Sequence, residues 1–151
     1  MKIATMKEQF SPGYVLGHRV TPLPTIGDFA MLEVVTDPGT PGPPMHHHPG
    51  FSEFFYICDG TLDLVLEDGK RRLEAGEGAT IAAGVLHSFD NPGDAPVRFV
   101  TGFSPRGFEA FFEGARVPCD EPDARARSVS PEKLGWVGAN AAPLGMVIKE
   151  G

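Results

Sequence analysis

The sequence is poor in cysteine and in long apolar segments. It has 151 residues and only 2 cysteines, Cys58 and Cys119, which are too few for a disulfide framework. No run of roughly 18 apolar residues is present, so we expect no membrane span. Residues 1–8 lack the apolar core of a signal peptide. Together these absences predict a protein of the reducing cytoplasm.

Basic residues are also scarce. The chain carries 13 Lys and Arg against 20 Asp and Glu, which gives a formal net charge of −7. Nucleic-acid binding depends on a basic surface that neutralises phosphates. We therefore expect no nucleic-acid partner and favour a small-molecule substrate.

Turn-forming residues, in contrast, are abundant. The chain has 19 Gly and 15 Pro, and 41% of its residues are hydrophobic, at a length that suits one domain with a real core. The turn residues separate short segments of aromatic and branched residues, and this spacing predicts a barrel or sandwich. The expected strands are 14–16, 18–20, 29–35, 53–58, 61–66, 70–74, 79–82, 87–91 and 96–103.

The pattern changes toward the C-terminus. Ser104-Pro105 and Ser130-Pro131 each place a capping residue before a proline, which is typical of a helix start. We expect the second helix to run through Trp136 and residues 118–127 to form a loop. The first helix would bear an apolar stripe that packs on the barrel, made of Phe108, Phe111 and Phe112.

A histidine-rich segment precedes the most apolar strand. In an extended chain side chains alternate between faces, so His46 and His48 share one face while His47 points away. Glu53 opens the next strand, and His87 opens a later one. Imidazole and carboxylate together suit one divalent transition metal, such as Fe, Zn, Ni, Mn or Cu.

The two segments resemble the two motifs of the cupin superfamily, over residues 30–104. The departures fall on turn positions, where Thr40 replaces a glycine and Ala82 replaces a proline. Every position of the metal-ligand pattern is intact. The matching positions are His46, His48, Glu53 and Gly60 in the first motif, and Gly76, Gly84, His87 and Asn91 in the second.

The resemblance implies an all-β fold, a single cupin β-barrel (double-stranded β-helix or jelly roll) with one or two short C-terminal helices. It divides the chain into an N-terminal strand arm at 1–28, a barrel at 29–104 and a C-terminal helical segment at 105–151 that packs on the barrel. In similar proteins the N-terminal region lies along the barrel or swaps onto a partner subunit, so a homodimer is expected.

The resemblance also implies a metal held by His46, His48, Glu53 and His87, with coordination positions left for water or substrate. Glu53 is in addition the candidate catalytic base. The alternative is a metal-free pocket, as in cupins that have lost their ligands. Other polar residues receive ordinary roles. His18 is expected to be solvent-exposed or structural, Cys58 a small core residue, and Asp59 and Asp63 turn and surface residues.

Strand alternation also predicts the lining of the pocket. The side chains that share a face with the ligands or lie on the inner face of the last strand are Phe55, Ile57, Phe89, Phe99 and Phe103. No Lys or Arg has clear inward parity near the ligands. An apolar, aromatic lining of this kind suits a small aromatic or polyketide-like substrate better than a sugar phosphate.

Three functions are compatible with this site. The first is an oxygenase that resembles the flavonol-dioxygenase-like small cupins and acts on a phenolic or enol-type substrate. The second is a non-redox enzyme, a zinc-dependent isomerase or polyketide cyclase. The third is a cupin that binds a small molecule without turnover. We favour the oxygenase, and the identity of the metal would separate it from the second function.

Overall fold

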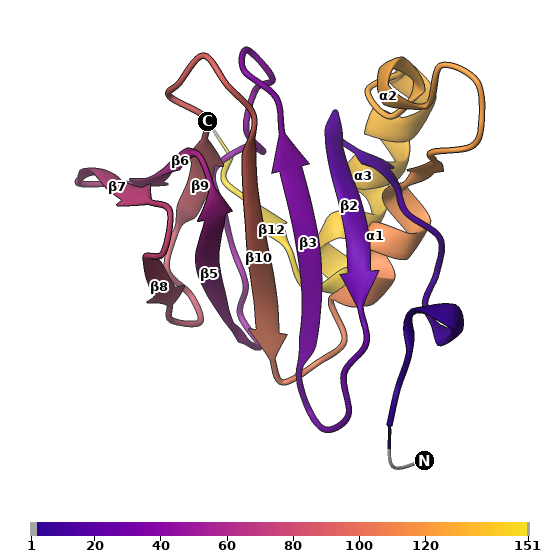
Figure 1. Cartoon of the computed structure of the whole chain (residues 1–151), viewed down its shortest axis with the longest axis horizontal. Helices are drawn as coiled ribbons and strands as arrows, with labels where there is room; N and C mark the ends of the chain where they lie inside the picture. Colours follow the sequence, from indigo (N-terminus) through magenta and orange to yellow (C-terminus); the bar gives the residue numbers. More distant parts are fainter. Residues whose placement is uncertain (1–2, 151) are drawn as a thin grey trace.

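The computed structural model describes residues 3–150, which form two antiparallel sheets with the helices gathered at one side (Figure 1). Residues 1, 2 and 151, at the ends of the predicted arm and C-terminal segment, lie outside the described residues. The elements in chain order are η1 (Met6–Glu8), β1 (Gly13–Val15), β2 (His18–Leu23), β3 (Ala30–Thr36), β4 (His46–His47), β5 (Ser52–Asp59), β6 (Thr61–Leu66), β7 (Gly69–Glu74), β8 (Gly78–Ile81), β9 (His87–Asp90), β10 (Val97–Ser104), α1 (Glu109–Ala115), β11 (Val117–Pro118), α2 (Ala124–Arg127), α3 (Pro131–Leu144) and β12 (Val147–Ile148).

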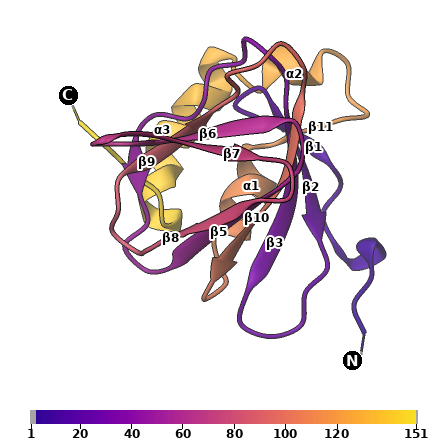
Figure 2. The ribbon, with the colours of Figure 1, turned by 60° about the vertical axis from the view of Figure 1, so that its left-hand side comes forward.

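The two sheets differ in size. The larger has seven strands in the order β11-β1-β2-β3-β10-β5-β8, and the smaller has five in the order β12-β4-β9-β6-β7. Figure 2 shows β6 and β7 of the smaller sheet lying across from β5, β8 and β10 of the larger. The predicted all-β class is confirmed. Among the described helices none is long and apolar enough to cross a membrane.

The core lies between the sheets because the strands alternate in burial. In β5 the side chains of Glu53, Phe55 and Ile57 are buried, while Tyr56 between them is exposed. Each buried phenylalanine or isoleucine contributes about 1.5–3 kcal/mol to the stability of the fold, because its apolar surface is removed from water. Gly60 turns the chain from β5 into β6 with a positive φ of 85°, a conformation that favours glycine.

The N-terminal arm adds strands to the barrel of its own chain. Strand β2 pairs with β3 and β1 pairs with β2, so both extend the larger sheet. The first strand ends at Val15 rather than at Leu16, because Leu16 and Gly17 take positive φ values in a tight turn. The predicted homodimer and the three-part division of the chain remain predictions.

One of the two predicted helix starts is wrong and the other is confirmed. Ser104 ends strand β10, where it pairs with Ser52, so the sheet takes it and α1 begins only at Glu109. Ser130 is the N-cap of α3 and its hydroxyl accepts a hydrogen bond from the backbone N–H of Lys133.

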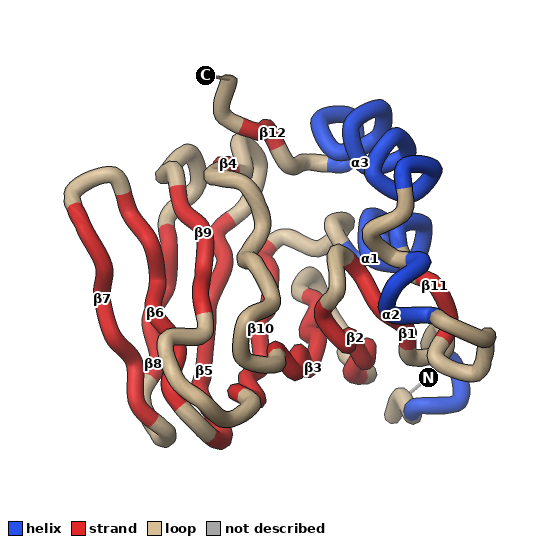
Figure 3. Tube along the Cα trace, turned by 90° about the horizontal axis from the view of Figure 1, so that it is seen from above, coloured by secondary structure: helices blue, strands red, loops and turns tan. Residues whose placement is uncertain are grey.

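The C-terminal region holds more structure than the sequence predicted. Helix α3 continues past Trp136 to Leu144, the expected loop at 118–127 contains the short helix α2, and the tail forms β12 beside β4. Figure 3 shows β12 emerging from the end of α3 and running toward β4.

Two polar residues predicted at the surface are buried. Asp63 is only 3% exposed and pairs with Arg72 across β6 and β7, which compensates its charge. His18 is 4% exposed, with Nδ1 bonded to the Thr36 hydroxyl and Nε2 to the Pro41 carbonyl. Because a carbonyl oxygen only accepts, Nε2–H donates and the Thr36 hydroxyl donates to Nδ1. Of the two roles predicted for His18, solvent exposure is wrong.

This buried histidine should make the stability of the fold depend on pH. Burial lowers the pKa of His18 from 6.5 to about 4. Between these values only the unfolded chain binds the proton, so acidification from pH 6.5 to 4 should lower the free energy of unfolding by roughly 3 kcal/mol through this group.

The variant His18→Gln does not titrate, and it should lose this part of the pH dependence. Urea unfolding of both proteins with a chelator present, between pH 6.5 and 4, measures the difference. Parallel curves of unfolding free energy against pH would contradict the assignment.

Candidate metal centre

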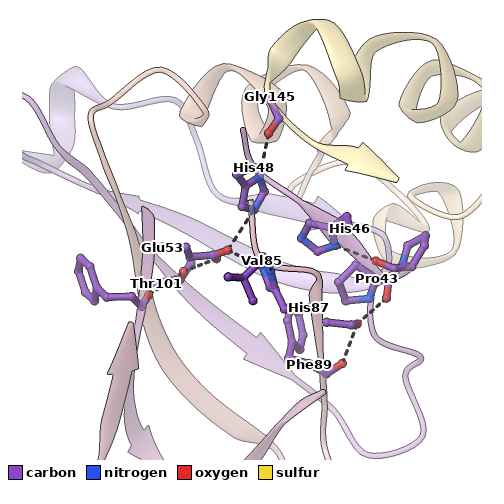
Figure 4. Close-up of polar contacts among 12 residues, drawn as sticks. Pro43, His46, His48, Glu53, Val85, His87, Phe89, Thr101 and Gly145 are labelled. Carbon is purple, nitrogen blue, oxygen red and sulfur yellow. Dashed lines mark hydrogen bonds and ion pairs between the residues drawn. The ribbon is translucent and has the colours of Figure 1, made fainter. Parts of the chain in front are cut away.

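Four buried side chains converge between the two sheets. His46, His48, Glu53 and His87 each offer one atom, and these atoms all lie within 4.8 Å of one another. Figure 4 shows His48, Glu53 and His87 turned toward a common point, with His46 beside them. The four residues predicted from the sequence therefore come together.

Each of the four reaches the cluster from a different place in the fold. His46 lies on β4 and pairs directly with His87 on β9, both in the smaller sheet. His48 follows β4, and Glu53 lies on β5 of the larger sheet. The cluster therefore spans the gap between the sheets. His47 is half-buried and is not part of the cluster, as the alternation predicted.

Backbone carbonyls fix the orientation of all three imidazoles. Nδ1 of His46 donates to Pro44 O at 2.7 Å, Nδ1 of His48 to Gly145 O at 2.8 Å, and Nδ1 of His87 to Val85 O at 2.9 Å. In a neutral ring this leaves Nε2 unprotonated, with its lone pair toward the cluster. Histidines that bind metals are oriented by hydrogen bonds of this kind.

The carboxylate of Glu53 needs a cation between itself and the histidines. Its Oε1 lies 3.1 Å from Nε2 of His48 and 3.0 Å from Nε2 of His87. These atoms are all acceptors when the rings are neutral, so only a proton or a metal ion reconciles such short distances. The donor set of three nitrogens and one oxygen fits a divalent transition metal.

The pKa values describe an ionised glutamate within the cluster. Burial opposes the ionisation of Glu53, but hydrogen bonds with His48 and His87 outweigh it and lower its pKa to about 2. Burial, assisted by the nearby His87, lowers the pKa of His46 to about 4. Burial also disfavours the charged form of His87, but the Glu53 carboxylate outweighs it and raises the pKa of this ring. The ionised glutamate supplies the charge that attracts a cation.

Thr101 holds the other carboxylate oxygen. Its hydroxyl lies 2.6 Å from Glu53 Oε2 and 3.0 Å from Phe54 O, and the side chain is 3% exposed. A donor at Oε2 leaves Oε1 as the oxygen that faces the histidines. Thr101 received no role from the sequence, because its partner Glu53 lies 48 positions away in the chain.

A cavity of about 60 Å³ adjoins the cluster. Three of the five predicted lining residues border it: Phe55, Phe89 and Phe99. Ile57 and Phe103 are buried in the core and do not. Ile57 lies four residues along the strand from Glu53, roughly 13 Å away. Phe103 is covered by Phe108, whose ring centre lies 5.1 Å from its own.

Residues outside the predicted site also border the cavity. The bordering residues that were not predicted from the sequence are Val15, Leu16, His18, Val20, Val34, Pro43, Thr101, Phe108, Phe111, Phe112 and Met146. The stripe on the first helix was visible in the sequence, but its spacing alone does not tell packing from cavity lining. Among the described residues that border the cavity there is no Lys or Arg.

The fold and the cluster define a small jelly-roll protein with a three-histidine, one-glutamate site. Residues 32–103 match the family Cupin_2, described as a cupin domain. The chain is therefore a small cupin-domain protein, and the predicted barrel is confirmed.

The chain is similar to several curated proteins and solved structures, including the following three. The chain is 37% identical to Protein SchB of Streptomyces halstedii over 60 residues, and this stretch makes up 40% of this chain and 44% of that protein. It is also 37% identical over 60 residues to Polyketide synthase CurC of Streptomyces cyaneus, covering 40% and 39%. The crystal structure of a cupin-superfamily sugar phosphate isomerase from Silicibacter pomeroyi superposes with a TM-score of 0.55 at 27% identity, over 60% of this chain and 61% of that chain. The chain thus spans less than half the length of both curated relatives.

The arrangement of the histidines predicts different effects for neighbouring substitutions. His48→Ala removes one of the four donor atoms, so the purified variant should lose most of its bound metal. His47→Ala should leave the metal content unchanged. Elemental analysis of the two purified variants checks this. Equal loss in both would mean that the ring of His47 also reaches the ion.

A second prediction concerns Thr101. Thr101→Val keeps the shape of the side chain but leaves Glu53 Oε2 without its donor, so metal affinity should fall about 10- to 100-fold. Thr101→Ser keeps the hydroxyl and should stay close to the unmodified protein. Competition titrations against a chelator measure both, and equal affinity of the valine and serine variants would refute the role.

Proposed function

We propose that the protein is a metal-dependent enzyme that acts on an enol-type or phenolic small molecule. With a redox-active ion bound, the enzyme would act as an oxygenase. The observation that carries the proposal is the buried cluster of three oriented imidazoles and one ionised carboxylate beside an aromatic cavity. Such a site combines a place for a cation with apolar surroundings that exclude water.

The charge of the cavity narrows the substrate class. Glu53 is its one acidic residue, and the described lining holds no Lys or Arg. A phosphate group would meet no cationic side chain there, and burying an unpaired charge is costly. This supports a neutral substrate and argues against transferring the substrate of the isomerase from Silicibacter pomeroyi to this chain.

The residues of the cluster have distinct tasks in this proposal. His46, His48 and His87 would hold the ion through Nε2, and Glu53 through Oε1. A divalent ion supplies Lewis acidity toward a substrate oxygen, and iron or copper adds redox capacity. Glu53 carries a negative charge, and once its carboxylate leaves the ion it is the base that would take the hydroxyl proton or the α-proton of the substrate.

A non-redox reaction is the second candidate, favoured by one comparison. CurC, one of the curated proteins that the chain resembles, is described as a polyketide synthase. Poly-ketone chains enolise and cyclise when a cation polarises a carbonyl group, and zinc would suffice for that chemistry. The same site would then belong to a polyketide cyclase or an isomerase. A third candidate is a cupin that binds its ligand without turnover.

Metal content and oxygen uptake together test the proposal. Protein purified without chelators should contain iron, nickel or copper at close to one ion per chain and should consume oxygen with a member of a panel of phenols and diketones. The matched control is His87→Ala, which should lose both metal and oxygen uptake.

The alternatives predict other outcomes. Zinc alone, with no oxygen uptake on any compound, would favour the cyclase or isomerase. Ligand binding that survives in metal-free protein and in His87→Ala would favour the binding protein.

A further inference from the structure

The cavity beside the metal cluster is small for the ligands that the proposed function requires. Its volume is about 60 Å³. A dry cavity of roughly 150 Å³ accommodates benzene, and pockets for larger ligands measure about 300–1,000 Å³. In this conformation an aromatic ring therefore does not fit next to His46, His48 and His87.

The wall that limits the space comes from outside the residues that match the cupin family. The family match ends at residue 103. Phe108, Phe111 and Phe112 border the cavity from α1 and the residue before it, and Met146 borders it from the segment after α3. This wall of the cavity is therefore made by residues outside the family match.

Phe108 is the wall residue packed most directly on a metal-site residue. Its ring centre lies 4.8 Å from that of His48, and its side chain is 3% exposed. It also stacks on Phe111 at 5.1 Å with nearly parallel rings. A phenyl ring thus already occupies the position beside the cluster.

Phe108 lies at the boundary between a loop and α1. Phe108 is the N-cap of α1, and Gly107 before it has a φ of +139°. No side-chain hydrogen bond caps this end of the helix. The ring therefore projects into the site from the start of a seven-residue helix.

We propose that Phe108 is the specificity-determining residue of the site, and that its ring fills the place which a ring-shaped ligand would take beside the metal ligands. This rests on the proposed function for the presence of the metal. Ligands of a few atoms reach the cluster directly, whereas ring-shaped ligands bind only when the phenyl ring moves aside.

The test compares Phe108→Ala with Phe51→Ala in protein loaded with Co²⁺, whose visible bands respond to ligands. Phe51 is a matched control because it also stacks on His48, at 4.5 Å, but does not border the cavity. Azide should shift the bands of the unmodified protein and of both variants. The ring-shaped probe 4-nitrocatechol should bind Phe108→Ala at least tenfold more tightly than the other two proteins. Equal affinity in all three, or an equal gain in Phe51→Ala, would overturn the proposal.

A second measurement needs no metal. In chelator-treated protein, benzene should raise the melting temperature of Phe108→Ala, because the substitution leaves a space the size of a phenyl ring. It should not affect the unmodified protein. Phe108→Leu, a smaller change, should show the same effect more weakly and replaces the alanine variant if that variant does not fold. Absence of a benzene shift in both variants would overturn the proposal.

The Co²⁺ and benzene measurements together distinguish a failure of this inference from a failure of the proposed function. If the unmodified protein binds no Co²⁺ but benzene stabilises Phe108→Ala, the metal-dependent function fails while the size limit set by Phe108 stands. If Co²⁺ binds but neither probe distinguishes the variants, the role of Phe108 fails alone.

Discussion

The structure depends on how one carboxylate is held among three imidazoles. Glu53 Oε1 lies about 3 Å from two unprotonated ring nitrogens when those rings are neutral, and such a group of acceptors is stable only around a cation. The orientation of the rings is not adjustable, because each Nδ1 is bonded to a backbone carbonyl. The barrel thus builds a cation site from side chains and backbone together.

That site exists only because the two sheets face each other. The histidines belong to the smaller sheet and its loops, while Glu53 and Thr101 belong to the larger. The carbonyl that orients His48 comes from Gly145, 97 positions later in the chain. Gly145 reaches this position by a left-handed turn at the end of α3, with φ of +111°. The C-terminal segment is therefore part of the site, not only a cover for the barrel.

The surroundings of the site are as informative as the ligands. Aromatic side chains from both sheets and from α1 border the cavity, and Glu53 is the one acidic residue among the described residues that line it. Dense aromatic packing excludes water, which strengthens the electrostatic interactions of the cluster, but it also leaves little room for a ligand. The size of the cavity and the size of the substrate are thus linked through the same phenylalanines.

The sequence by itself determined the ligands and most of the strands, because both depend on local spacing. Alternation along an extended chain separates His46 and His48 from His47, and turn residues such as Gly60 mark strand ends. The features that depend on partners distant in the chain were decided by the tertiary structure alone. Ser104 and Ser130 carry the same local capping signal, yet pairing with Ser52 draws Ser104 into a strand. His18 is buried because Thr36 and Pro41 satisfy both its nitrogens. Phe108 borders the cavity because the start of α1 packs on His48 and on Phe103 of β10. Such contacts join residues far apart in the chain, so no local pattern encodes them.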